Sequence, residues 1–183
     1  MAGTAAACAA IAVPHVVYLI MWTRPEIWLR RCKRIGRDPC REMAWWMVAM
    51  KGIQAIAVLL WLWKVEGGSG RLWWETWTFN LYRAFAVVLF CAGQFLNVAC
   101  YKALGLNGIY YGVKYGKKVP WSHEWPYGGK FSLRHPQYVA SVMTVWCAML
   151  LLSLDVHYLN GAYVILGFWT ACYVATALSE DLL

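Results

Sequence analysis

Charged residues are scarce in this sequence of 183 residues, at 14%, against about 25% in soluble domains. Hydrophobic residues make up 61%, above the roughly 45–50% of the same class. This scarcity of charge excludes a water-soluble globule and a disordered chain. The seven cysteines contain no C-x-x-C pair, so we predict neither a metal site nor a secreted disulfide scaffold. The composition is typical of a polytopic membrane protein.

Acidic residues are the scarcer sign of charge, with nine Asp and Glu against 17 Lys and Arg and a net charge of +8. In a soluble protein such an excess would indicate a nucleic-acid partner. Here the basic residues lie between apolar stretches. We therefore expect them to orient the chain in the bilayer and to contact the phosphates of anionic lipids. The predicted partner is a membrane phospholipid, with no nucleic acid.

Five apolar stretches divide the chain, and a membrane span needs roughly 17–25 such residues. They are Ala5–Trp22, Met43–Trp63, Ala84–Leu104, Val139–Leu154 and Tyr158–Leu178. The first contains Pro14 and is the weakest, so we expect it to lie shallow or to enter the bilayer in part. The fourth is short, and only three residues separate it from the fifth, which predicts a tight helical hairpin. We predict an all-α transmembrane bundle of four full spans plus a weaker N-terminal apolar helix, in one domain over 1–183.

The basic residues are distributed unevenly between these stretches. The segment 23–42 holds seven Lys and Arg and the segment 102–134 holds six, whereas 64–83 holds three and the turn at Asp155 holds none. The positive-inside rule places the first two segments on the cytoplasmic side or its equivalent. The C-terminus then lies on that same inner side of the membrane.

Glycines recur at positions 105, 108, 112 and 116, and on one continuous helix they would fall within about 80° of one another. We therefore expect a bare backbone stripe on one helical face. The stripe would serve close helix packing or the approach of a ligand to the backbone, and the spacing favours packing. Lys114, Lys117 and Lys118 follow at the expected inner interface, where they would set topology or hold a phosphate.

A few polar residues mark the ends of the apolar stretches or interrupt them. His135 precedes Pro136, which disfavours a helical conformation before it and suits a first helical turn. We therefore expect His135 at the membrane interface, just outside a helix. Glu180 and Asp181 end the last stretch, where acids oppose the helix dipole, and no basic residue follows them. Lys51 is an ionisable residue inside a span and so a functional candidate by default.

Six short segments carry a recognisable pattern. They are Thr23–Arg31, Ala103–Gly112 with its G-x-x-G-x-Y-Y-G run, Tyr115–Gly116, Trp125–Tyr127, the H-P-Q-Y of His135–Tyr138, and Tyr173–Asp181. Together they resemble the phosphatidylethanolamine N-methyltransferase family over most of the chain. The specific part of this resemblance is the glycine and tyrosine run combined with H-P-Q-Y.

Members of that family bind S-adenosylmethionine at a G-x-G motif in the third span and at a Glu-Glu pair after the last. The resemblance places the first motif at Cys91-Ala92-Gly93, where only Gly93 matches. It places the second at Glu180 and Asp181, where the second acid is shortened. Gly93, Glu180 and Asp181 would therefore hold the donor. The implied reaction is methylation of phosphatidylethanolamine, or of its mono- and dimethyl forms, towards phosphatidylcholine.

The acceptor amine must lose a proton before it is methylated, and His135 is the candidate base. Lys117, Lys118 or Arg134 would pair with the lipid phosphate. Tyr138 would offer an aromatic face to a methylated ammonium group.

Two other interpretations stay open. The departures at Cys91 and Asp181, with a shorter polar tail than relatives carry, motivate a non-catalytic subunit that binds lipid or scaffolds a larger membrane complex. Isoprenylcysteine carboxyl methyltransferases share an R-H-P-x-Y element, which Arg134–Tyr138 matches, and this motivates a prenylcysteine carboxyl methyltransferase. A homo-oligomer is equally open, and we expect the membrane to be that of the endoplasmic reticulum or the mitochondrion.

Overall fold

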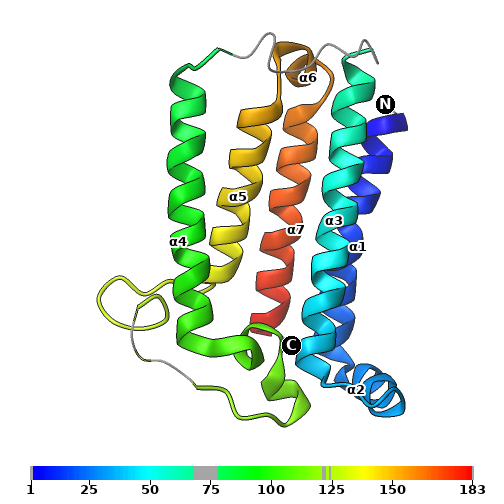
Figure 1. The fold of residues 1–183 in the computed structure, drawn as a ribbon, viewed down its shortest axis with the longest axis vertical. Coiled ribbons are helices and arrows are strands. Elements are labelled where there is room, and N and C mark those ends of the chain that lie inside the picture. Colours follow the sequence, from blue (N-terminus) through cyan, green and yellow to red (C-terminus); the bar gives the residue numbers. More distant parts are fainter. Residues whose placement is uncertain (1, 68–77, 121–122, 124, 183) are drawn as a thin grey trace.

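The computed structural model describes residues 2–67, 78–120, 123 and 125–182 and has the form of an upright bundle of helices (Figure 1). Its elements are α1 (Ala2–Thr23), α2 (Pro25–Arg34), α3 (Pro39–Val65), α4 (Leu81–Ile109), the short 3-10 helix η2 (Gly112–Tyr115), α5 (Pro136–Leu152), α6 (Asp155–Leu159) and α7 (Ala162–Leu182). No strand occurs in these described ranges. The predicted all-α transmembrane bundle is confirmed.

Four segments have the length and composition to cross a membrane: α1, α3, the segment Leu81–Tyr115 and α7. The chain is therefore an integral membrane protein. Although α1 was expected to be the weakest, it runs through Pro14 as one helix of 22 residues. The fourth stretch is short as predicted, because α5 has only 17 residues.

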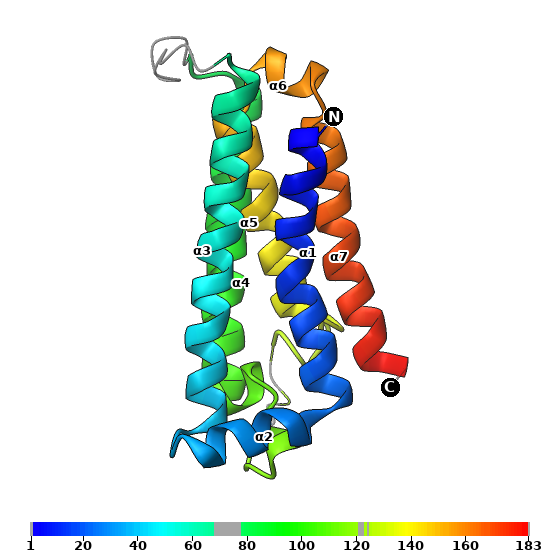
Figure 2. The same ribbon diagram turned by 90° about the vertical axis from the view of Figure 1, so that its right-hand side faces the viewer.

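The helices pack in a regular pattern. The most extensive contact is between α4 and α5, α1 packs against both α3 and α7, and α5 packs against α7. Figure 2 shows α1 in front of the bundle, between α3 and α7. By contrast, α3 and α4 barely touch, so one side of the bundle is less closely packed than the others.

The two ends of the bundle carry different segments. One end, which we call the inner end, holds α2, η2, the start of α5 and the C-terminus (Figure 1). The opposite outer end holds α6 and the N-terminus. The segments 23–42 and 102–134 therefore lie at the same end, as their excess of basic residues predicts.

The connection at the outer end is longer than the predicted hairpin turn. The residues after Leu154 form α6, and α7 begins only at Ala162. His157 accounts for the difference, since its side chain is almost fully buried. Its Nδ1 accepts the Leu154 N–H at 2.8 Å and its Nε2 donates to the Leu62 carbonyl at 3.0 Å. These bonds hold α6 against the end of α3.

The predicted glycine stripe is wrong. Gly105 has φ 60 and ψ −177, so α4 bends there, and the helix ends at Ile109. Positive φ is readily adopted by glycine but is unfavourable for residues with a Cβ atom. A Cβ on Gly112 would lie 2.6 Å from the Asn107 carbonyl oxygen. The glycines therefore fold the chain back on itself and do not share one helical face.

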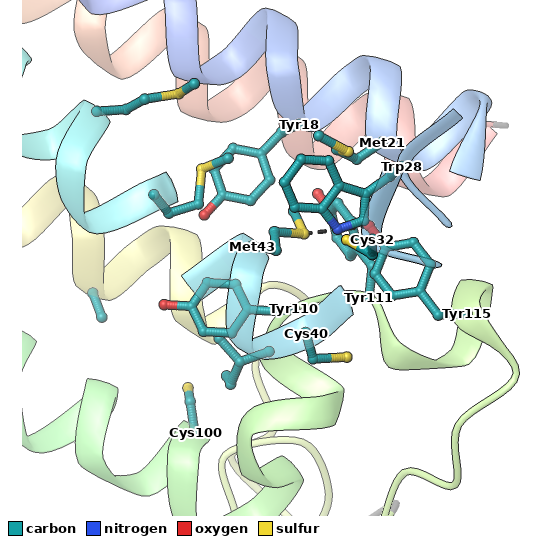
Figure 3. Packing of buried hydrophobic residues seen from close by; sticks show 14 of the residues in the cluster. Tyr18, Met21, Trp28, Cys32, Cys40, Met43, Cys100, Tyr110, Tyr111 and Tyr115 are labelled. Carbon is teal, nitrogen blue, oxygen red and sulfur yellow. Dashed lines mark hydrogen bonds between the residues drawn. The ribbon is translucent and has the colours of Figure 1, made fainter. Parts of the chain in front are cut away.

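Two clusters of buried side chains form the core. The inner cluster contains Tyr18, Met21, Trp28, Cys32, Cys40, Met43, Met47, Met50, Leu96, Cys100, Ile109, Tyr110, Tyr111, Tyr115 and Ala140. The outer cluster contains Ala7, Ile11, Val58, Trp61, Leu62, Val145, Met149, Ala162, Ile165, Leu166 and Tyr173. Figure 3 shows tyrosine rings and sulfur atoms interleaved in the inner cluster. There the Tyr115 hydroxyl donates to Met43 Sδ at 3.4 Å.

Candidate active site at the inner end

The start of α5 presents His135 as predicted. His135 is the residue before the first helical turn, with φ −131 and ψ 65, and Pro136 occupies that turn. Pro136 has no N–H to leave unbonded there, and it keeps the preceding residue out of the helix. The His135 side chain is 22% exposed, so it lies at the surface of the bundle without being fully in water.

The end of α7 meets His135 through Asp181. The His135 Nε2 lies 3.1 Å from Asp181 Oδ2, and an Arg134 guanidinium nitrogen lies 3.2 Å from the same oxygen. Arg134 thus supplies the positive charge that the sequence lacks after Asp181, and His135 adds a hydrogen-bonding group. This contact offsets the unfavourable position of the acid at a helix C-terminus. The Nδ1 of His135 has no hydrogen-bond partner among the described residues.

Glu180 is held by two tyrosines. The hydroxyls of Tyr111 and Tyr138 both donate to Glu180 Oε1, and these two hydroxyls lie 3.3 Å apart. The second carboxylate oxygen has no hydrogen-bond partner within the described part of the chain. Glu180 is therefore fixed in orientation and still has one oxygen with which to bind a ligand.

Tyr111 reaches Glu180 because the backbone is folded tightly around it. Its φ of 56 is left-handed, which is uncommon for a bulky residue. Strain of this kind persists where surrounding contacts over-determine the conformation. Its ring lies 5.7 Å from the Tyr18 ring and 5.1 Å from the Trp22 ring. Two side chains of α1 therefore support the tyrosine that binds Glu180.

The other predicted site residues lie elsewhere. Gly93 faces α5, where an added Cβ would meet the Ala140 carbonyl oxygen at 3.1 Å and Met143 Cβ at 3.2 Å. Its small size therefore permits the close contact of α4 with α5. The assignment of Gly93 to donor binding stays a prediction.

The two lysines proposed for the lipid phosphate also lie apart from Glu180. Lys117 Nζ pairs with the Asp38 carboxylate, which caps α3 by accepting the N–H groups of Cys40 and Arg41. This pairing holds the pKa of Asp38 below its ordinary value. Lys118 is exposed. A phosphate role for either lysine stays a prediction, and Lys117 already has an anionic partner.

Sequence reasoning missed His15, which is buried on α1. The Thr176 hydroxyl donates to the Cys172 carbonyl at 2.8 Å, so it accepts from His15 Nδ1, 3.0 Å away. The Nε2 of His15 is then an acceptor. A small enclosed cavity of about 10 Å³ is lined by His15 together with Lys51 and Tyr138. Only the position of His15 in a span could have suggested it.

Comparison with known proteins gives the family of the chain. The sequence model for phospholipid methyltransferases matches residues 81–180, from α4 to Glu180. The chain belongs to the phospholipid methyltransferase family. It is 37% identical over 135 residues to the phosphatidyl-N-methylethanolamine N-methyltransferase of Arabidopsis thaliana, across 74% of this chain and 71% of the relative. No solved structure matches it.

Membership of this family confirms the prediction of a methyltransferase enzyme that acts on phospholipid. The match does not favour a non-catalytic subunit. The matched region includes His135, Tyr111 and Glu180, whereas Asp181 follows it directly. Among the described residues no group of three or more His, Cys, Asp and Glu could hold a metal ion.

Proposed function

We propose that this phospholipid methyltransferase transfers a methyl group from S-adenosylmethionine to the amine of phosphatidylethanolamine or its mono- and dimethyl forms, towards phosphatidylcholine. The observation that carries the proposal is the His135–Asp181 pair beside the tyrosine-bound Glu180. The name of the Arabidopsis relative supports a monomethylated acceptor. The membrane would be that of the endoplasmic reticulum or the mitochondrion.

The residues around Glu180 fit a methyl donor that carries an amino group, ribose hydroxyls and a sulfonium. The free oxygen of Glu180 would accept a hydrogen bond from the amino group or a ribose hydroxyl. The electron-rich ring faces of Tyr138 and Tyr111 would attract the sulfonium cation of the donor. S-adenosylmethionine, when bound, supplies an electrophilic methyl group. Gly93 is kept as a further donor-binding candidate, through close approach to the backbone.

His135 would act as the general base. If its Nε2–H donates to Asp181, the opposite nitrogen Nδ1 carries the lone pair. Asp181 thereby fixes the orientation and the tautomer of the ring. Nδ1 would accept the proton of the lipid ammonium, and the free amine would then be the nucleophile. Base catalysis of this kind contributes typically about 10²–10⁴-fold.

Positioning would supply much of the remaining acceleration, because the reaction is an in-line displacement. Tyr138 lies between the two parts of the site, with its ring 5.9 Å from the His135 ring and its hydroxyl on Glu180. It would offer a face to the methylated ammonium as charge develops there. Arg134 is largely exposed, at 78%, and would reach a lipid phosphate at the interface while it pairs with Asp181.

The proposal is tested by calorimetry of S-adenosylmethionine binding to the detergent-purified protein and to Glu180→Gln. The amide keeps the shape of the side chain and removes its charge. We expect saturable binding by the wild type and binding at least tenfold weaker in the variant, since hydrogen bonds to a charged group contribute about 1.5–3 kcal/mol. Asp155→Asn, an acid at the outer end, is the matched control and should bind normally.

A second assay would follow methyl transfer to phosphatidylethanolamine, phosphatidyl-N-methylethanolamine and a prenylcysteine analogue. We expect the two phospholipids to accept the methyl group and the prenylcysteine analogue to remain unmodified. Absence of donor binding by the wild type at millimolar concentration, or methylation of the prenylcysteine analogue alone, would sink the proposal.

A further inference from the structure

A second cavity opens on the side of the bundle where α3 and α4 barely touch. It has a volume of about 500 Å³. Its polar lining residues are Lys51 from α3, Gln94, Asn97 and Lys102 from α4, and Gln137 and Ser141 from α5. In Figure 1 α3 and α4 stand apart, with α5 and α7 between them. We call this cavity the side groove.

The side groove runs from the middle of the bilayer to its inner boundary. Lys51 is twelve residues from the start of α3, which at 1.5 Å per residue is about 18 Å along the helix. Lys102 is three residues before the bend at Gly105. Gln137 lies in the first turn of α5 at the inner end. A molecule in the groove would therefore lie along the bilayer normal and reach the depth of the lipid headgroups.

Three polar side chains in the side groove lack a protein partner within the described ranges, whereas Gln94 donates to Thr144. Lys51, Asn97 and Gln137 make no side-chain hydrogen bond or ion pair with any residue in the described ranges. Within hydrocarbon an unsatisfied polar group costs several kcal/mol, and an intramembrane charge is retained chiefly for function. A polar molecule in the groove would satisfy these groups.

The charge of the side groove selects an anion. Its described lining includes Lys51 and Lys102 and no acidic residue. The anion that the bilayer offers is the phosphate of a phospholipid, which lies at the inner boundary, the end of the groove where Lys102 and Gln137 stand. The amides of Asn97 and Gln137 are hydrogen-bond donors for phosphate or ester oxygens. The apolar helix faces that flank the groove suit the acyl chains.

The side groove adjoins the candidate active site. Lys51, Gln137 and Ser141 line both the groove and the small enclosed cavity beside it. The same cavity is lined by Tyr138, whose hydroxyl donates to Glu180. The small cavity and the Tyr138 side chain thus lie between a headgroup in the groove and Glu180.

We propose that the side groove between α3, α4 and α5 is the site where the phospholipid substrate enters laterally from the bilayer, with its phosphate held by Lys51 and Lys102. This proposal rests on the proposed function and names the binding site of its lipid, with the two groove lysines in place of Arg134 as the contacts of the phosphate. The phosphate lies in the side groove, and the amine of the headgroup extends through the small cavity towards Tyr138 and His135.

The first test measures lipid dependence in mixed micelles. Lys51→Met removes the charge and keeps the length and apolar stem of the side chain. We expect its KM for phospholipid to rise roughly tenfold to a hundredfold, as for loss of a charge-assisted contact, while the Kd for S-adenosylmethionine stays within about twofold of the wild type. Lys51→Arg should restore much of the lipid affinity. Lys64→Met, on α3 at the outer end, is the matched control and should leave KM unchanged.

A second test adds a readout that needs no methyl transfer and a variant that keeps both charges. A phosphatidylethanolamine with a photoactivatable headgroup should label wild-type peptides around Asn97, and the Lys51→Met, Lys102→Met double variant should lose this labelling. Val98→Trp would fill the groove with both lysines intact, and we expect it to raise the lipid KM as well. Unchanged KM and equal labelling in all variants would overturn the proposal. Normal groove labelling in a wild type that transfers no methyl group would instead refute the proposed function.

Discussion

The two ends of the bundle bury polar groups in different ways. At the outer end His157 uses both ring nitrogens on backbone groups, the Leu154 N–H and the Leu62 carbonyl. At the inner end Glu180 and His135 bond to other side chains, and each keeps one atom without a partner in the described structure. Groups satisfied entirely by backbone stabilise a fold, whereas groups with an unused donor or acceptor are available to a ligand. The inner end is therefore where chemistry is possible.

The packing follows the same division. The inner cluster is rich in Tyr, Met and Cys, and the outer cluster consists mainly of aliphatic residues. Methionine fills irregular gaps and adapts to a changing neighbour, and buried tyrosines supply hydroxyl donors. The outer end should thus contribute mostly to stability and the inner end mostly to activity. Three substitutions test this division, and a fourth measures what one helix cap at the inner end adds to stability.

The largest effect is expected for His135→Ala. Loss of the base should lower kcat by about 10²–10⁴-fold, with the Kd for the methyl donor nearly unchanged. Rising pH should restore activity to the variant more than to the wild type, because the lipid amine then loses its proton without help. A kcat within threefold of the wild type, or equal pH profiles, would remove His135 from the chemistry.

His157→Ala should have the next largest effect, on stability. The substitution removes both hydrogen bonds and leaves a buried carbonyl without a partner, which costs about 1–3 kcal/mol. We expect a lower melting temperature in detergent and a nearly normal kcat in the protein that remains folded. His157→Gln keeps a donor and an acceptor and should lose less stability than His157→Ala. A variant with normal melting and impaired catalysis would reverse the assignment of the outer end.

Tyr111→Phe should weaken donor binding by about tenfold, since a hydrogen bond to a charged group contributes about 1.5–3 kcal/mol. The ring contacts with Tyr18 and Trp22 remain in this variant. Tyr115→Phe is the matched control, because among the described residues its hydroxyl bonds only the Met43 sulfur, and calorimetry should show normal donor affinity. Equal affinities in the two variants would mean that the hydroxyl on Glu180 is not used in binding.

Asp38→Ala should have the smallest effect, a loss of about 1 kcal/mol of stability, as for removal of a helix N-cap. Asp38→Asn keeps the helix cap and removes the ion pair with Lys117, so it should lose less stability than Asp38→Ala. That pairing lowers the pKa of Asp38, so its contribution is present above the ordinary pKa of about 3.9 and is lost as pH falls through the lowered value. Thermal unfolding at neutral and acid pH should therefore show the wild type and Asp38→Asn converging in acid.

Much of the fold could be predicted from the sequence. Apolar stretches and the distribution of Lys and Arg are properties of single segments, so the helices and the shared inner end followed from them. The position of His135 followed from Pro136 for the same reason. The bend at Gly105 could not be predicted by spacing, because periodicity assumes a continuous helix and glycine permits both conformations.

The contacts of the site were less predictable. Glu180 and Asp181 were identified as an anomaly at a helix end, but their partners come from elements distant in the chain. Tyr111 was visible only as part of a motif, because its role depends on a left-handed backbone and on two rings of α1. Lys117 looked free in the sequence, since its partner Asp38 lies 79 residues away.

The shortness of α5 has a consequence for the surrounding lipid. Its 17 residues extend about 26 Å, less than the hydrocarbon thickness of about 30 Å. One way to accommodate a helix shorter than the hydrocarbon is to thin the bilayer around it. Such thinning would draw the headgroup plane of the inner leaflet towards the start of α5, where His135 lies. Under the proposed function, membrane thickness would then affect how readily the amine of a lipid reaches His135.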